Sequence, residues 1–170
     1  GYLSAVLKEA GFTVKLFDST FYTSSMTTDT NEEKVHLSIV KPFSWKDRNI
    51  IPKTTDMMAD FQEMVENFQP DLIAVSVVEN TWFIADAMLR ELNADIPTVV
   101  GGVFPTYAPE IVINHPNVHY LCRGDGELPL KDLCEAMATG QETTRIASIW
   151  AKVDDQVHRN IVTEFAGKGS

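Results

Sequence analysis

The sequence predicts an α/β fold in which a parallel sheet is covered by helices on both faces, giving three layers. Two observations lead to this prediction. Helix-like and strand-like segments alternate as far as Gly140, and such alternation favours parallel strands joined by crossover helices. The run from Leu72 to Val78 is almost continuously apolar, as in a strand whose two faces are both buried. A chain of 170 residues with 44% hydrophobic residues can bury a substantial core.

Helices are expected where apolar residues recur every three or four positions. The first begins at Tyr2 and ends at Gly11, a residue type that often terminates helices. Asn80 or Thr81 is expected to cap a later helix, and Asp125 or Glu127 the last one. A stripe of methionine and phenylalanine in residues 57–68 is interpreted as core. The remaining helices are expected near residues 80–92, 109–114 and 130–139.

Parallel strands are expected at residues 13–17, 72–78, 97–100 and 118–122. Residues 19–33 and 42–55 have loop composition, and residues 35–40 are compatible with a short extra strand. After Arg145 the pattern changes to two strand-like runs, residues 146–153 and 157–165, separated by a turn. We therefore expect a C-terminal β-hairpin appended to the core.

A doubly wound sheet normally begins with a strand, whereas this chain begins with a helix. We therefore expect a flavodoxin-like doubly wound sheet whose first strand is missing, between the strands at 13–17 and 72–78. The hairpin, a second copy of the chain or misassigned N-terminal residues would fill that place, because buried backbone groups need partners. The expected domains are residues 1–144 and a hairpin linker, residues 145–170.

Charge and cysteine content narrow the classes of function. The formal net charge of −10 makes nucleic acid and anionic membranes poor partners. No apolar run is long enough to cross a membrane and no secretion signal is visible, so a cytoplasmic location is expected. Cys122 and Cys134 form no metal or disulfide pattern and are interpreted as two buried thiols.

Three loops follow the expected parallel strands and carry the candidate site, because ligands of such sheets bind at the carboxyl ends of the strands. Gly101 and Gly102 directly follow a strand, so a flat ligand could approach the backbone there, although a sharp turn explains them equally well. The candidate cofactor-binding residues are Ser76, Val77, Glu79, Asn80, Thr81, Gly101, Gly102, Val103, Phe104, Pro105, Arg123, Gly124, Asp125, Gly126 and Glu127.

Other chemical motifs are missing from the sequence. There is no GxGxxG, no P-loop and no GxSxG elbow. The four histidines do not fall at zinc-ligand spacing with one another or with the cysteines. No catalytic residue and no protein metal ligand is therefore predicted.

Four segments resemble the N-terminal cobalamin-binding domain of cobalamin-dependent radical SAM enzymes, of the anaerobic magnesium-protoporphyrin cyclase and methyltransferase type. They are residues 1–11, the run Pro70–Ser76 (similar to "PDLVGIS"), Ile96–Thr106 (similar to "IPVVLGGPHPT") and Arg123–Glu127 (similar to "RGEGE"). They occur in the family's order. The hairpin resembles the linker strands that lead into the radical SAM barrel of these enzymes.

The resemblance implies a cobalamin-binding module of a multidomain enzyme that performs methyl transfer or related radical chemistry. Cobalamin would be bound base-off, since no Asp lies two positions before a His and the DxHxxG motif of other cobalamin domains is absent. S-adenosylmethionine and a [4Fe-4S] cluster would belong to a barrel domain that this sequence lacks. That barrel would be the main partner, with a homodimer of this chain as a further option. The chain alone is not expected to be catalytic.

Two alternatives remain open at this point. The first is a degenerate domain of the same fold that binds nothing and only supports a barrel or a partner. The second is an independent flavodoxin-like enzyme or signalling domain. Cobalamin titration separates the binding module from the scaffold, and a CxxxCxxC motif downstream would argue against the independent domain.

Overall fold

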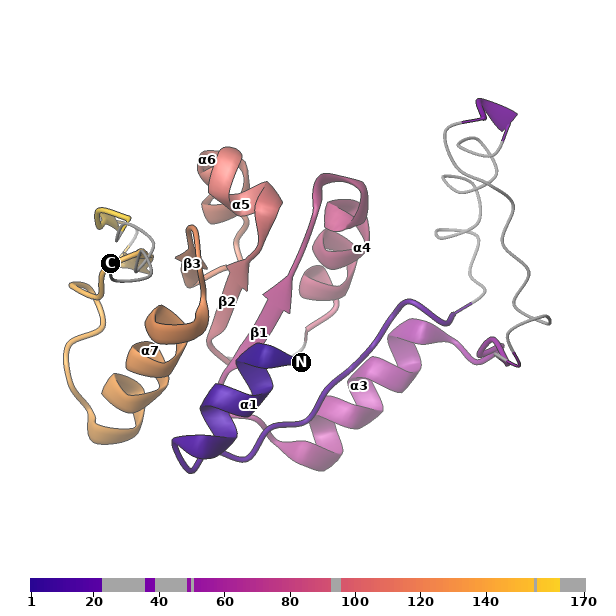
Figure 1. The fold of residues 1–170 in the computed structure, drawn as a ribbon, viewed down its shortest axis with the longest axis horizontal. Coiled ribbons are helices and arrows are strands. Elements are labelled where there is room, and N and C mark those ends of the chain that lie inside the picture. The colour runs from indigo at the N-terminus through magenta and orange to yellow at the C-terminus, as the bar shows by residue number, and fades with distance from the viewer. Residues whose placement is uncertain (23–35, 39–48, 50, 93–95, 155, 163–170) are drawn as a thin grey trace, which may run out of the picture. The chain divides into compact units, whose positions relative to one another are not determined.

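A computed structural model describes residues 1–22, 36–38, 49, 51–92, 96–154 and 156–162 (Figure 1). The chain divides into two compact units. Unit 1 comprises Gly1–Val14 and Pro70–Ser170, and unit 2 comprises Lys15–Gln69. Unit 1 contains the sheet and every predicted site residue.

The sheet of unit 1 has five strands in the order β1-β2-β3-β4-β5. The first three strands along the chain pair in parallel, with Ile73 opposite Thr98 and Val99 opposite Tyr120. The last two strands form an antiparallel hairpin, which pairs with β3. The predicted parallel core and C-terminal hairpin are therefore confirmed. The strands are β1 (Ile73–Ser76), β2 (Thr98–Gly101), β3 (Tyr120–Cys122), β4 (Ile149–Val153) and β5 (Gln156–Arg159).

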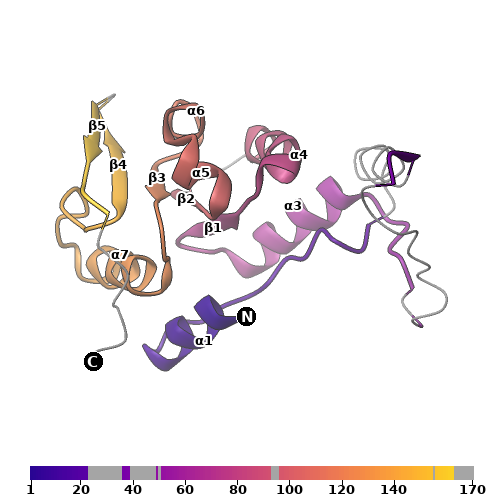
Figure 2. The ribbon, with the colours of Figure 1, turned by 45° about the horizontal axis from the view of Figure 1, so that its top comes forward.

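Helices cover both faces of this sheet (Figure 2). On one face lie α4 (Glu79–Arg90), α5 (Val103–Tyr107) and α6 (Pro109–Ile113), and on the other α1 (Tyr2–Glu9) and α7 (Glu127–Thr139). Successive strand residues alternate between the two cores, as the pleat of a strand requires. Val100, Leu121 and Trp150 belong to the core cluster that includes α4 and α6, whereas Val99, Cys122 and Ile149 belong to the cluster that includes α1 and α7.

The strand predicted at residues 13–17 is wrong. Residues 12–19 form no strand, and Leu16 is 75% exposed. Within unit 2 the Phe17 ring instead packs against the rings of Tyr22 and Phe61. The alternating pattern is present, but a strand also requires a neighbour to complete its hydrogen bonds, and no described strand pairs with this segment.

The hairpin does not take the position beside β1 at which the missing first strand was expected. The hairpin pairs with β3, whereas β1 lies at the opposite end of the strand order and pairs only with β2 among the described strands. The loops expected at 19–33 and 42–55 lie largely outside the described residues. Of the strand suggested at 35–40, residues 36–38 are described and form no strand.

The helix ends follow the sequence predictions only in part. Gly11 and Gly140 follow α1 and α7 with φ of +91° and +66°, conformations that favour glycine. Thr81 lies inside α4, where its hydroxyl accepts from the Val78 N–H and donates to the Val78 carbonyl. No side chain caps α7, so the predicted cap by Asp125 or Glu127 is wrong. Glu127 is already the first residue of that helix, where its charge favours the positive helix end.

Unit 2 contains helix α3 (Met57–Phe68), which occupies the predicted range. Asp56 caps it by accepting from the backbone N–H groups of Met58 and Ala59. Met57 and Phe61 are buried, in agreement with a core role for this stripe. No helix in the described ranges combines the length and apolarity that crossing a membrane requires.

Candidate functional site

The candidate site lies at the carboxyl ends of β1, β2 and β3. We call residues 76–81 the first loop, 101–106 the second and 123–127 the third. Because these three strands are parallel neighbours, their carboxyl ends meet at one edge of the sheet. The fold therefore brings the three predicted loops to the same edge.

The first and second loops are in direct backbone contact. The Val77 N–H donates to the Gly101 carbonyl at 2.9 Å, and the Phe104 N–H donates to the Val77 carbonyl at 3.4 Å. Gly102 has a φ of +111°, and a Cβ at this position would lie 2.5 Å from the Val77 carbonyl oxygen. Gly102 is therefore required by the packing of the protein against itself, whatever it does toward a ligand.

The second and third loops are joined through Thr106. Its hydroxyl donates to the Gly102 carbonyl at 2.8 Å and accepts from the Gly124 N–H at 3.1 Å. A Cβ at Gly101 would lie 3.4 Å from the Cys122 Cβ, so the two strand ends also pack closely. Thr106 was not among the predicted site residues. Its position four residues after Gly102, where a helical hydroxyl reaches back to a carbonyl, was the available signal.

Several predicted site residues face inward. Val77 is 4% exposed, and Pro105 is fully buried. The Phe104 ring packs against the Trp82 ring with a centroid distance of 5.7 Å. The other residues of the first loop are accessible: Ser76, Glu79, Asn80 and Thr81 are all exposed.

Large apolar side chains are exposed where the three strands end. Val78 follows β1, Val103 begins the helix after β2, and Leu128 lies in the first turn after β3. Their exposed fractions are 47%, 60% and 63%, and Tyr107, one turn after Val103, is 84% exposed. Each belongs to an element that follows a parallel strand. This edge therefore offers apolar surface to a ligand.

The third loop carries three charged side chains at this edge, in addition to Glu79 of the first loop. Arg123 lies over the Trp150 ring, 5.2 Å from its centroid, and its Nη2 is 3.5 Å from the Thr106 carbonyl oxygen. The pKa of the Cys122 thiol is raised to about 11, mainly by burial and in part by the carboxylates of Glu127 and Asp125. Burial also raises the pKa of Cys134. Both cysteines are free thiols; Cys122 is buried, as predicted, whereas Cys134 is only half-buried.

Comparison with known proteins places this geometry in a family. The family "B12 binding domain" matches residues 43–134, more than half of the chain. The chain belongs to the B12-binding domain family. The matched range contains all three loops completely and ends at Cys134, within α7.

Curated relatives of this B12-binding domain are much longer proteins. The "Uncharacterized methyltransferase PH0819" of Pyrococcus horikoshii is 25% identical over 103 residues, which cover 58% of this chain and 22% of that protein. The anaerobic magnesium-protoporphyrin IX monomethyl ester cyclase of Rubrivivax gelatinosus is 24% identical over 144 residues, covering 82% and 20%. The chain thus spans about a fifth of the length of these relatives.

Solved structures share the fold. The radical S-adenosylmethionine methyltransferase TsrM from Kitasatospora setae superposes with a TM-score of 0.67 at 18% identity, over 94% of this chain and 26% of that one. The cobalamin-dependent S-adenosylmethionine radical enzyme OxsB superposes with a TM-score of 0.55 at 21% identity, over 64% and 16%. The resemblance to cobalamin-dependent radical SAM enzymes is therefore confirmed at the level of family and fold.

The histidines of unit 1 in this B12-binding domain lie away from the three loops. His119 precedes β3, and its Nδ1 accepts from the N–H of Thr98, the first residue of β2. His158 in β5 is opposite Ala151, which is itself opposite Tyr120 at the start of β3. His115 lies in the connection from α6 to β3. All three are thus at the amino ends of the parallel strands.

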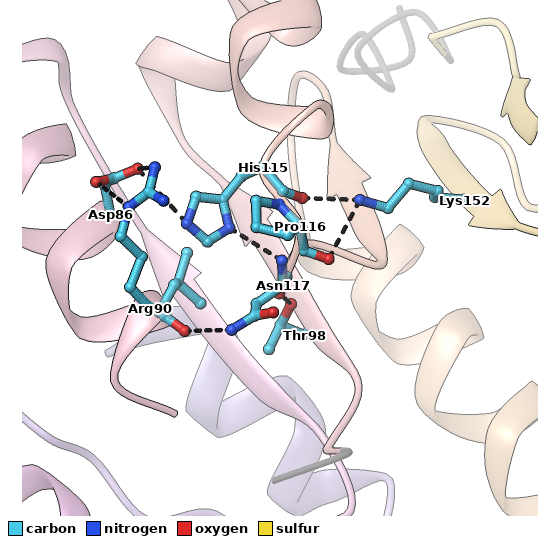
Figure 3. A network of polar contacts seen from close by, with 8 residues as sticks. Asp86, Arg90, Thr98, His115, Pro116, Asn117 and Lys152 are labelled. Atoms are coloured by element: carbon cyan, nitrogen blue, oxygen red, sulfur yellow. Dashed lines mark hydrogen bonds and ion pairs between the residues drawn. The ribbon is translucent and has the colours of Figure 1, made fainter. Parts of the chain in front are cut away.

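His115 is at the centre of a partly buried polar network at that end, which we call the amino-edge network: Asp86, Thr98, His115, Asn117 and Lys152 (Figure 3). Its Nδ1 accepts from the Asn117 N–H at 3.1 Å, so the neutral ring carries its proton on Nε2. Nε2 lies 3.5 Å from Asp86 Oδ1, which is too long for a strong hydrogen bond. Lys152 donates to the His115 carbonyl at 2.7 Å.

The amino-edge network joins three elements to the connection between α6 and β3. Asn117 Nδ2 donates to the Leu89 carbonyl of α4 at 2.7 Å, and the Thr98 hydroxyl of β2 donates to the Asn117 carbonyl. Lys152 brings in β4. Burial lowers the pKa of His115 and outweighs the opposing effect of Asp86. A neutral, buried histidine with these contacts is a structural group. No cluster of three or more potential metal-binding side chains occurs within the described residues.

Proposed function

We propose that this chain binds cobalamin at the carboxyl edge of its parallel strands and serves as the cobalamin module of a larger radical SAM enzyme. The observation that carries the proposal is the set of exposed apolar side chains at this edge, Val78, Val103, Tyr107 and Leu128. Cofactor sites combine such apolar surface with a few fixed polar groups. Family membership identifies the cofactor class.

The residues present fit a large, flat cofactor with polar edges. Val103 and Leu128 would contact the ring, while Ser76, Asn80 and the backbone of the third loop are accessible for its polar groups. When bound, cobalamin would supply cobalt chemistry such as methyl transfer. Phe104 and Pro105 would act from the core by supporting Val103, since their own side chains face inward.

We further propose that the cofactor binds base-off, without a histidine ligand from this chain. The support is the position of His115, His119 and His158 at the amino ends of the strands. Titration with hydroxocobalamin, followed by absorbance, tests both proposals. A base-off spectrum with a dissociation constant of about 10 µM or below is expected, and it should survive replacement of all four histidines.

A matched pair of variants locates the site. Val103→Asp should weaken binding at least about tenfold, because a charge would be buried against the ring. Ile111→Asp introduces the same charge at a residue of nearly equal exposure, 61% against 60%, in α6 and outside the three loops. Equal affinity losses in the two variants would argue against a site at the carboxyl edge.

The scaffold alternative is also supported by a specific observation. Gly102 and the inward-facing Val77, Phe104 and Pro105 are all explained by internal packing. At about 100 µM hydroxocobalamin, the spectrum of the mixture is compared with the sum of the separate cofactor and protein spectra. If the two are equal, the scaffold function replaces cobalamin binding.

S-adenosylmethionine and the [4Fe-4S] cluster are proposed to belong to another part of the complete enzyme. This chain has two cysteines, fewer than the thiolate set that such clusters use. Anaerobic reconstitution with iron and sulfide is expected to give no stable cluster absorbance on the isolated chain. A stable cluster would contradict this assignment.

A further inference from the structure

The hydroxyl of Thr106 connects two of the three site loops. It lies in α5 and donates to the Gly102 carbonyl, as threonine often does four residues along a helix. In addition it accepts the N–H of Gly124, a residue of the third loop with a φ of +77°. The hydroxyl thus acts as both a donor and an acceptor, and these two hydrogen bonds fix its orientation.

Beside this bond, the third loop is anchored mainly to the hairpin, where the Arg123 N–H donates to the Ser148 carbonyl at 2.9 Å, and its other contacts with the second loop are weak. Arg123 Nη2 reaches the Thr106 carbonyl at only 3.5 Å, which is a weak contact. A Cβ at Gly124 would approach the Val162 side chain to 3.1 Å, so the third loop also lies against the residues that follow β5. Among the described contacts, the hydrogen bond from the Gly124 N–H to the Thr106 hydroxyl is therefore the well-formed side-chain bond that joins the second loop to the third.

We propose that Thr106 is a positioning residue of the cobalamin site, which sets the spacing of the second and third loops without touching the cofactor. This inference rests on the proposed function. Val103 in the second loop and residues 123–127 in the third present the groups proposed to contact cobalamin. A change in loop spacing would alter how both fit the same rigid ring.

Two substitutions at residue 106 separate the hydroxyl from the bulk of the side chain. Thr106→Val keeps the shape and removes the hydrogen bonds, leaving the Gly124 N–H without its acceptor. Thr106→Ser keeps the hydroxyl. Thr139→Val is the matched control, because the Thr139 hydroxyl also donates to a carbonyl one turn back in its helix, that of Glu135, and accepts no N–H among the described contacts.

The test measures hydroxocobalamin affinity together with hydrogen exchange of the Gly124 amide. The Thr106→Val variant should bind hydroxocobalamin about tenfold more weakly, which is the loss expected for one hydrogen bond. Its Gly124 amide hydrogen should exchange faster. Thr106→Ser should restore both to within about threefold, and Thr139→Val should change neither. If Thr106→Val fails to fold, Thr106→Ala is compared with Thr106→Ser in the same two measurements.

The outcomes separate this inference from the function on which it rests. Faster exchange at Gly124 with unchanged affinity in Thr106→Val would overturn the positioning role while leaving cobalamin binding intact. Equal affinity losses in Thr106→Val and Thr139→Val would overturn it too. If the wild-type chain binds no cobalamin, the proposed function fails and the positioning role fails with it, while Gly124 exchange still reports whether the hydrogen bond exists.

Discussion

At the residue scale, His115 shows how a buried group can make stability depend on pH. Its side chain is almost fully buried, and burial lowers its pKa in the folded protein. The unfolded chain therefore takes up a proton at a higher pH than the folded chain does. The stability linked to His115 is complete above the ordinary histidine pKa of about 6.5 and is lost as the pH falls below it.

We therefore expect the free energy of unfolding to decrease from about pH 7.5 to about pH 5.5. Urea unfolding at several pH values measures the slope. His115→Gln should lower stability at the higher pH by about 1–3 kcal/mol, through lost hydrogen bonds, and should flatten the slope. Asp86 does not interfere, because its lowered pKa places its own effect below the ordinary aspartate value of about 3.9. An unchanged slope in the variant would assign the pH dependence to another group.

Gly102 makes a second prediction at this scale. Gly102→Ala should destabilise unit 1 by about 3 kcal/mol or more, because it combines a strained φ with a clash against the Val77 carbonyl. Gly11→Ala is the control, since Gly11 has a φ of +91° but no atom within 4 Å of the added carbon. It should cost only about 1 kcal/mol from backbone strain. Chemical denaturation of both variants gives the comparison, and equal costs would mean that the contact with Val77 is relieved by loop movement.

At the element scale, the C-terminal hairpin is part of the core. Its β4 strand pairs with β3, and Ile149 and Ala151 are completely buried. Ile149 belongs to the cluster that includes α1 and α7, and Trp150 to the opposite cluster. The hairpin therefore contributes to both layers of packing around the sheet.

Ile149→Ala is accordingly expected to reduce the free energy of unfolding by about 2–4 kcal/mol, because it leaves a cavity in the core. Val153→Ala in the same strand is the control. Since Val153 is 38% exposed, its replacement should reduce the free energy of unfolding by well below about 1 kcal/mol. Denaturation followed by tryptophan fluorescence tests this, because Trp150 is in the same strand. Similar losses in the two variants would indicate a hairpin that behaves independently of the core.

Local patterns and long-range contacts were not equally predictable. The helix at 57–68 and the strand at 72–78 could be predicted because their apolar spacing lies within one segment of the sequence. The alternating pattern at 13–17 could not show whether a strand forms there, since strand pairing depends on a partner that is distant in the sequence. The three loops followed from a rule about parallel sheets.

The interior of the site was less predictable than its location. The close approach of Gly102 to Val77 depends on how two separate loops meet, and no short pattern in the sequence records it. The burial of Pro105 is of the same kind, because it depends on how α5 sits on the sheet. Thr106 was overlooked because a threonine in a short helix has an ordinary local role, and its tertiary bond to Gly124 becomes visible only in the fold.

At the scale of the whole molecule, the net charge of −10 is a source of self-repulsion. Raising NaCl from about 0.01 M to about 0.1 M shortens the Debye length from about 30 Å to about 10 Å. We expect the thermal midpoint to rise by a few degrees over this range. Scanning calorimetry measures the shift, and it should vanish at a pH where the chain carries no net charge. A fall in the midpoint with salt would mean that attractive ion pairs outweigh the repulsion.

The interlocked loops also limit how this domain can diverge over evolutionary time. Gly102 fits against the backbone at Val77, and Thr106 holds Gly124, so an altered loop changes the fit of the next one. Among descendants of a common ancestor, replacements of Gly102 or Thr106 should therefore be accompanied by other changes in the three loops. The amino-edge network shares none of these contacts, so it should drift independently. Lineages that acquire a new specificity at the carboxyl edge would then inherit the three loops as one unit.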